Sequence, residues 1–211
     1  MTDSKYIFYS KETRWFFREE QKSLEQWFND HQVFFDEAPG RTDYYLRMSA
    51  QQNIGYKLRE GKTEIKMRLG EDESREFLNG HKAVVNNWVK WSLVLKSRAD
   101  APDQLYTLDK SAFLALNKKR VLITFEVHDD HSVQIINPGD HPAEGCQVEL
   151  TELIYKDQTW YSFGFEAFGE NANLDRNFKL VTNRVMSEIQ QPKLTIEASF
   201  SYPSFLLELQ P

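Results

Sequence analysis

The amino-acid sequence predicts an α+β protein built on an antiparallel eight-stranded β-barrel, closed or nearly closed, with helices flanking it. Three observations predict this fold class. Segments in which apolar and polar residues alternate recur along the chain, as expected of strands whose side chains point to opposite faces. Short turn signals separate most of these segments, and short connections join antiparallel neighbours. Aromatic residues make up 14% of the chain and fall largely in the alternating segments, which is typical of strands with large inner faces.

The first half of the chain supplies about half of the predicted strands. Residues 6–17 alternate in polarity and predict a strand, whereas residues 19–30 carry apolar side chains at helical spacing and predict a helix. Residues 41–70 predict strands that reverse at Glu60-Gly61, a tight hairpin turn. The later half of residues 84–96 alternates again and predicts another strand of the barrel.

The second half of the chain completes the barrel and adds the C-terminal elements. Three alternating segments predict strands, residues 120–128, 147–155 and 160–168. An apolar stripe predicts a C-terminal helix over residues 173–190, and the alternation of residues 194–209 predicts a tail strand. Because no repeat, low-complexity segment or composition shift marks a boundary, we expect a single barrel domain over residues 1–211.

Basic residues gather between residues 41 and 70, in a chain whose formal charge is −6. This stretch has seven Lys and Arg against three Asp and Glu, a net charge of +4. Lys57 and Arg59 share one strand face, as do Lys66 and Arg68, so a paired hairpin places four cations on one side if its register aligns them. That side is either a solvated sheet face, or a concave basic surface that binds a polyanionic small molecule.

The composition argues against several classes of protein, namely membrane, secreted and nucleic-acid-binding proteins. Charged residues make up 27% of the chain and no run is long and apolar enough for a transmembrane helix, so we expect no membrane association. The first ten residues lack a secretory signal, and the single cysteine, Cys146, excludes an intramolecular disulfide and a cysteine-rich zinc site. These features favour a cytoplasmic location. The net charge of −6 argues against broad nucleic-acid binding.

The order of these features resembles the CYTH, or triphosphate tunnel metalloenzyme, superfamily over residues 6–189. SKETR at residues 10–14, followed by Phe16-Phe17, is similar to the family's E-x-E-x-K strand, and RTDYY at residues 41–45 is similar to its D-x-Y-Y strand. The basic hairpin of the family resembles YKLREG at residues 56–61 with EIKMR at residues 64–68. Its later part resembles KKR at residues 118–120 and the acidic strands around Glu126, Glu149 and Glu166.

The resemblance implies a tunnel that binds a triphosphate, with a divalent metal held by glutamates. Members of the family hydrolyse inorganic triphosphate, thiamine triphosphate or RNA 5′-triphosphate ends, or cyclise ATP. The chemistry is physically consistent, because a triphosphate with about four negative charges requires several Lys and Arg partners. Mg²⁺ or Mn²⁺ requires oxygen ligands, and would orient the phosphoryl group and activate water.

The resemblance also implies roles for individual residues. Glu12 is the surviving N-terminal acid and the catalytic candidate. The resemblance makes Arg14, Lys57, Arg59, Lys66, Arg68 and Arg120 candidates for binding the triphosphate. Two further candidates come from the residues themselves, Arg47 from the basic stretch and Lys90 from the alternation of its strand. The candidate ligands for Mg²⁺ or Mn²⁺ are Glu12, Glu126, Glu149 and Glu166.

The chain departs from the family pattern at two positions. Ser10 stands where the family has its first glutamate, and Thr151 stands where a later acid pair has its second member. A two-metal site that lacks two carboxylates binds cations more weakly, so the tunnel and its usual chemistry are separable here. The remaining glutamates also have a purely structural interpretation, as partners in cross-strand salt bridges.

Three functions remain open from the sequence. The first is a metal-dependent triphosphate phosphohydrolase, and the second is a non-catalytic tunnel for an anionic ligand. The third is a lipocalin-like barrel for an apolar ligand, which requires aromatic side chains inside and cations outside. The first two predict a small-molecule polyphosphate as the partner, and the sequence leaves a homodimer open.

Overall fold

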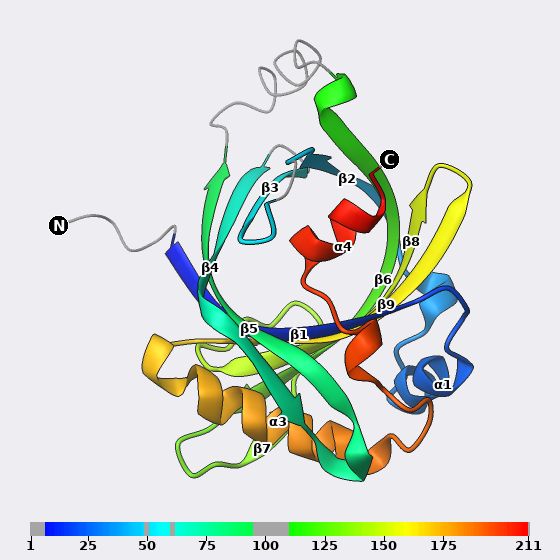
Figure 1. Cartoon of the computed structure of the whole chain (residues 1–211). Coiled ribbons are helices and arrows are strands. Elements are labelled where there is room, and N and C mark those ends of the chain that lie inside the picture. The colour runs from blue at the N-terminus through cyan, green and yellow to red at the C-terminus, as the bar shows by residue number, and fades with distance from the viewer. Residues whose placement is uncertain (1–6, 49–50, 60–61, 95–109, 211) are drawn as a thin grey trace, which may run out of the picture.

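The computed structural model describes residues 7–48, 51–59, 62–94 and 110–210. Within them, nine strands form one antiparallel sheet, and eight of these strands close into a barrel (Figure 1). Around the ring they are β2 (Gly40–Leu46), β3 (Ile54–Arg59), β4 (Lys62–Glu76), β5 (Lys82–Val94), β1 (Ile7–Phe17), β9 (Gln158–Phe168), β8 (Gly145–Tyr155) and β6 (Phe113–Val127). β2 pairs with β6 and closes the ring, whereas β7 (Val133–Ile135) pairs with the far end of β6 and takes no part in it. The predicted fold class is confirmed.

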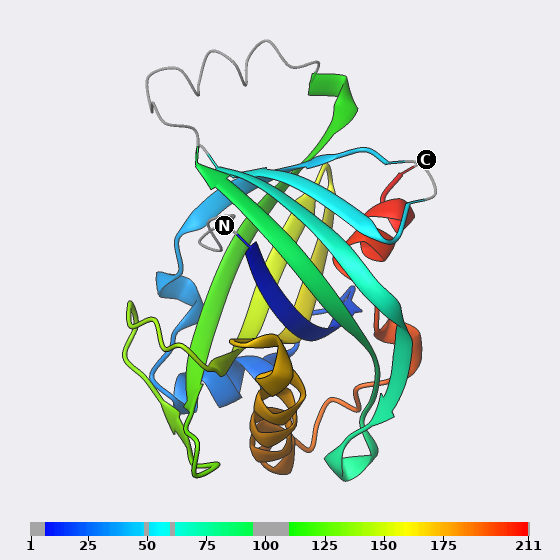
Figure 2. The ribbon, with the colours of Figure 1, turned by 90° about the vertical axis from the view of Figure 1, so that its left-hand side faces the viewer.

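Two helices cover the outside of one wall. α1 (Lys22–Asp30) and α3 (Leu174–Glu188) pack against the wall formed by β1, β9, β8 and β6, and α3 runs beneath that wall in Figures 1 and 2. α3 closely matches the helix predicted over residues 173–190. No helix in the described part of the chain is both long and apolar enough to cross a membrane.

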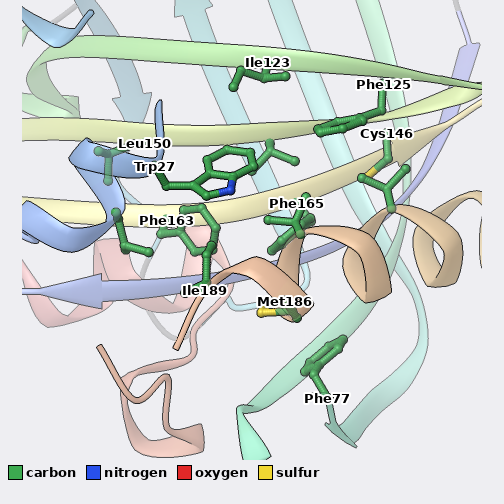
Figure 3. Close-up of a cluster of buried hydrophobic side chains, with 14 of the residues drawn as sticks. Trp27, Phe77, Ile123, Phe125, Cys146, Leu150, Phe163, Phe165, Met186 and Ile189 are labelled. Atoms are coloured by element: carbon green, nitrogen blue, oxygen red, sulfur yellow. The ribbon is translucent and has the colours of Figure 1, made fainter. Parts of the chain in front are cut away.

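The main apolar core lies between this wall and the helices rather than inside the barrel. Trp15 of β1 stacks on Phe163 of β9 with ring centroids 6.0 Å apart, and Phe165 packs edge-on against Phe178 of α3 at 6.5 Å. Figure 3 shows this cluster of aromatic and aliphatic side chains around α3. Because strand side chains alternate, the residues next to these aromatics, such as Arg14, point into the barrel. The wall therefore presents charge to the interior.

The C-terminal segment differs from its prediction. Residues 194–209 do not form a tail strand, and that prediction was wrong, because a short 3₁₀ turn, Ile196–Ala198, and the helix α4 (Tyr202–Glu208) replace the strand. The helix has its own start signal: the Ser201 hydroxyl accepts a hydrogen bond from the Ser204 backbone N–H, and Pro203 lies in the first turn. Phe205, Leu206 and Leu209, whose spacing also fits a helix, are buried.

α4 lies inside the ring of strands, where it fills one end of the barrel (Figure 1). Phe205 stacks on Phe16 of β1 with ring centroids 3.9 Å apart, and it meets Trp160 edge-on at 5.1 Å. The inward-facing Leu114 and Leu116 of β6 belong to the same apolar cluster. This end of the barrel is therefore packed with apolar side chains, and the charged residues lie deeper along its axis.

Candidate anion-binding tunnel

A cavity of about 780 Å³, counting the part open to solvent, occupies the middle of the barrel, and we call it the cationic tunnel. All eight barrel strands and α4 contribute side chains to it. Among the described residues, its cations are Arg14, Arg41, Lys57, Arg59, Lys66, Lys90, Lys118 and Arg120. Its carboxylates are Glu12, Asp43, Glu64, Glu149 and Glu166. Eight cations face five carboxylates, so the lining carries a formal excess of three positive charges inside an acidic protein.

The strand register explains why these charges share one face. Lys57 of β3 lies opposite Glu64 of β4, and Lys66 of β4 lies opposite Lys90 of β5. Directly opposed residues of antiparallel strands point to the same side of the sheet. The hairpin cations Lys57, Arg59 and Lys66 therefore point into the barrel, which the alternation alone left undecided. The predicted Glu60-Gly61 turn lies outside the described residues.

Glu149 of β8 is held by two arginines. Arg14 Nη1 donates to Glu149 Oε1 at 2.7 Å, and Arg120 Nη1 donates to Oε2 at 2.8 Å. The Thr151 hydroxyl donates to Oε1 at 3.0 Å. Burial raises the pKa of the Glu149 carboxyl, but the charges of Arg14 and Arg120 outweigh it and hold that pKa well below its usual range. Both oxygens of Glu149 are therefore occupied as hydrogen-bond acceptors, and the two arginines favour its charged form.

Two further ion pairs lie next to this one. Lys66 Nζ contacts both carboxylate oxygens of Glu12, and the Ser10 hydroxyl donates to the same carboxylate. Lys90 Nζ lies 3.7 Å from Glu166 Oε1. Burial raises the pKa of Glu166, but the charges of Lys90 and Lys66 outweigh this effect and lower it to about 2. Both carboxylates are paired with ammonium groups.

α4 lies at the closed end of the cationic tunnel, where its Tyr202 contacts the buried Lys118 of β6. Lys118 Nζ donates to the Tyr202 hydroxyl of α4 at 2.9 Å and to the Tyr45 hydroxyl at 2.5 Å, and it lies 3.2 Å from Asp43 Oδ2. The Tyr45 and Tyr202 rings stack with centroids 5.8 Å apart. Burial lowers the pKa of Lys118 to about 7, although Asp43 opposes the shift.

The opposite end of the cationic tunnel is open. A hollow of about 810 Å³, counting the part open to solvent, lies there and shares Lys90 and Glu166 with the tunnel. Phe8, His141 and Phe168 also line it. The inward residues of β1 and β6 run from this mouth to the apolar cluster under α4, so in the described part of the chain the tunnel opens at this mouth and is filled at the other end.

Three residues that the sequence suggested do not line the cationic tunnel. Arg47 donates to the Tyr155 hydroxyl at 3.3 Å, in the apolar end of the barrel. Arg68 pairs with Asp72 and Asn53. Glu126 accepts from Gln134 Nε2 of β7 at 2.9 Å, beyond the tunnel. The sequence-suggested residues that the structure does bring together are Glu12, Arg14, Lys57, Arg59, Lys66, Lys90, Arg120, Glu149 and Glu166.

Sequence reasoning missed six polar residues of the lining, namely Arg41, Asp43, Tyr45, Glu64, Lys118 and Tyr202. Strand parity was a signal for some of them, because Lys118 lies two residues from Arg120 and Glu64 lies two residues from Lys66. Tyr202 gave no such signal, since its position depends on α4 docking inside the barrel.

The donor set does not fit a resident Mg²⁺ or Mn²⁺. Of the four predicted metal ligands, Glu126 lies outside the tunnel and the other three are engaged by Lys or Arg. The described part of the chain offers no group of three or more His, Cys, Asp or Glu side chains placed to hold a metal. Ser10 and Thr151 add hydroxyl donors where a metal site needs charged oxygens.

No family model and no curated protein matches the chain. Similar solved structures include a conserved hypothetical protein from Pyrococcus furiosus, with 12% identity and a TM-score of 0.45 over 94% of this chain and 99% of that one. A candidate adenylate cyclase from Bacillus halodurans has 10% identity and a TM-score of 0.39, over 86% of this chain and 94% of that one. An RNA triphosphatase from S. pombe has 10% identity and a TM-score of 0.40, over 89% of this chain and 80% of that one. Because these TM-scores are below 0.5, the fold class rests on the strand topology, and the CYTH resemblance stays a prediction.

Proposed function

We propose that this protein binds a small polyphosphate anion, of the triphosphate class, inside the cationic tunnel. The observation that carries the proposal is the convergence of eight cationic side chains from six strands on one cavity inside the barrel. Charges that line a cavity within a low-dielectric protein focus the field and attract anions more strongly than charges on an open surface. The excess of positive charge in the lining is what a multiply charged anion neutralises.

One arginine in the tunnel has an unused donor. Arg59 Nε is buried and has no hydrogen-bond acceptor among the described residues. A buried N–H without a partner costs about 1–3 kcal/mol, so a ligand oxygen that accepts from it gains more than a contact with a solvated group would. Phosphate oxygens suit the planar guanidinium fork, and Arg41 and Arg120 present the same fork to the tunnel.

The closed end determines how the ligand enters. With α4 and its apolar cluster filling one end, the anion enters from the mouth beside Lys90 and Glu166. A phosphate chain then extends toward Arg14 and Lys118, and any organic group stays at the mouth, near Phe8 and Phe168.

The apolar-ligand alternative has less support. It requires aromatic side chains around an empty interior, but the aromatic interior is already occupied by Phe205 and Leu206 of α4. The interpretation of the hairpin cations as a solvated outer face also fails, because Lys57 and Lys66 line the interior. The hydrolytic part of the family resemblance needs a metal that the donor set does not fit, so the proposal covers binding.

Calorimetric titration and thermal unfolding with sodium tripolyphosphate test the proposal. At a ligand concentration of 100 times Kd, binding stabilises the fold by about 2.7 kcal/mol, which raises Tm by roughly 5–10 °C for a chain of this size. Lys57→Gln should weaken binding at least tenfold. The matched variant Lys179→Gln, at an exposed position on α3 outside the barrel, should not. Absence of binding by the wild type, or equal loss in both variants, would refute the proposal.

A further inference from the structure

Resting on the proposed function, we infer that the cationic tunnel takes its polyphosphate as the metal-free anion. Lys66 and Lys90 neutralise Glu12 and Glu166, the two carboxylates of the described lining that are directly opposed on neighbouring strands and could share a cation. The substrate class is therefore a free polyphosphate, and its metal complex is excluded.

The register builds this arrangement. Glu12 of β1 and Glu166 of β9 are directly opposed, and both point into the tunnel. Opposed like charges are unfavourable unless a cation lies between or beside them. Lys66 of β4 and Lys90 of β5 are also directly opposed, and their ammonium groups reach Glu12 and Glu166. The two ammonium groups thus neutralise the two carboxylates, and the repulsion within each pair of like charges is offset.

The third carboxylate of this region cannot complete a metal site. Both oxygens of Glu149 accept hydrogen bonds, Oε1 from Arg14 and Thr151 and Oε2 from Arg120. Ser10, beside Glu12, also acts as a donor. The neighbours of these acids are donors, whereas Mg²⁺ and Mn²⁺ need oxygen acceptors and retained waters.

The charge of the lining favours the same conclusion. A divalent cation entering the tunnel meets eight positive side chains, and it must displace ammonium groups from their carboxylates. A polyphosphate without metal keeps its full negative charge, whereas chelation reduces that charge and weakens its attraction to the lining. Magnesium should therefore compete with the protein for the anion.

Titration of the wild type with sodium tripolyphosphate, once with EDTA and once with excess MgCl₂ at matched ionic strength, tests the inference. We expect binding in EDTA and at least tenfold weaker binding in magnesium. Equal or tighter binding in magnesium would overturn the inference and leave the proposed function standing. Absence of binding in both buffers would overturn the proposed function itself.

Two isosteric variants give a test of opposite sign. Glu12→Gln and Glu166→Gln release Lys66 and Lys90 for the ligand, so each should tighten tripolyphosphate binding in EDTA by about tenfold. Weaker binding, which carboxylates that hold a ligand-bound metal would give, contradicts the inference. Glu37→Gln, an exposed glutamate on the 3₁₀ turn Phe35–Glu37, is the matched control and should leave the affinity unchanged. Circular dichroism and Tm verify folding of each variant, and the wild-type titrations are independent of them.

Discussion

Replacing Glu149 by glutamine removes the charge that holds two arginines inside the barrel. The side chains of Glu149 and Arg14 are only 12% and 11% exposed, and that of Arg120 is 28% exposed. Deleting one partner of a buried ion pair typically costs about 3–5 kcal/mol, because the other charge stays buried without compensation. The amide of glutamine keeps one acceptor, so we expect the lower end of this range, about 3 kcal/mol.

Urea unfolding monitored by tryptophan fluorescence measures this loss. For a chain of this size, about 3 kcal/mol corresponds to a fall in Tm of roughly 6–12 °C. Glu37→Gln, an exposed glutamate on the 3₁₀ turn Phe35–Glu37, is the control, because a surface substitution should change the free energy of unfolding by less than about 0.5 kcal/mol.

The same variant also reports on the ligand. Arg14 and Arg120 have no carboxylate partner in Glu149→Gln, so an anion in the tunnel compensates their charge directly. Tripolyphosphate should therefore raise the Tm of Glu149→Gln by more than it raises the Tm of the wild type. A loss of less than about 1 kcal/mol without ligand, or an equal ligand effect in both proteins, would refute the reasoning that this pair is buried and lies at the anion site.

Three further predictions follow from the same contacts. Burial lowers the pKa of Lys57 to about 8, and a bound anion favours its charged form, so the affinity for tripolyphosphate should fall between pH 7 and 9. Calorimetry in buffers of different ionisation enthalpy should show proton uptake on binding. An affinity that does not change between pH 7 and 9 would contradict the prediction. The pKa of Lys118 is about 7 in the folded protein, below its unfolded value near 10.5, so the folded state binds fewer protons than the unfolded state. The free energy of unfolding of the wild type, relative to that of Lys118→Met, should therefore rise between pH 7 and 9 by at most about 1.4 kcal/mol per pH unit. Urea unfolding at each pH measures this difference, and a difference that falls with pH would contradict the prediction. Phe205→Ala removes the ring stacked on Phe16 and should cost about 3–5 kcal/mol, measured by urea unfolding, whereas a loss below about 1 kcal/mol would show that α4 is not anchored inside the barrel.

Strand parity made much of this site predictable from the sequence. A period of two places Lys57 with Arg59, and Glu12 with Arg14, on common faces whatever the rest of the chain does. Parity does not say which face is inside. That choice depends on the barrel closing through β2 and β6, which lie about 70 residues apart in the chain, and no local pattern encodes it.

Depth along the barrel axis was the second quantity that the sequence could not supply. Arg68 shares parity with Lys66, yet it lies beyond the tunnel and pairs with Asp72. Glu126 likewise lies past the mouth, beside β7. Position along the axis depends on the tilt and stagger of paired strands, which alternation in one strand does not reveal.

The docking of α4 inside the barrel was the third feature that the sequence could not supply. Its residues fit both an alternating and a helical pattern, and only contacts with distant residues such as Phe16 and Lys118 decide between them. Tyr202 therefore became part of the tunnel without any sequence signal, and the tail was predicted as a strand.

A crystal structure of the wild-type protein grown with sodium tripolyphosphate and EDTA tests the central claim most directly. The account predicts electron density for a phosphate chain between Lys57, Arg59 and Arg120, with an oxygen accepting from Arg59 Nε at about 2.7–3.2 Å. Phosphate bound only on the outer wall, or a tunnel whose ion pairs are unchanged at saturating ligand, would contradict it.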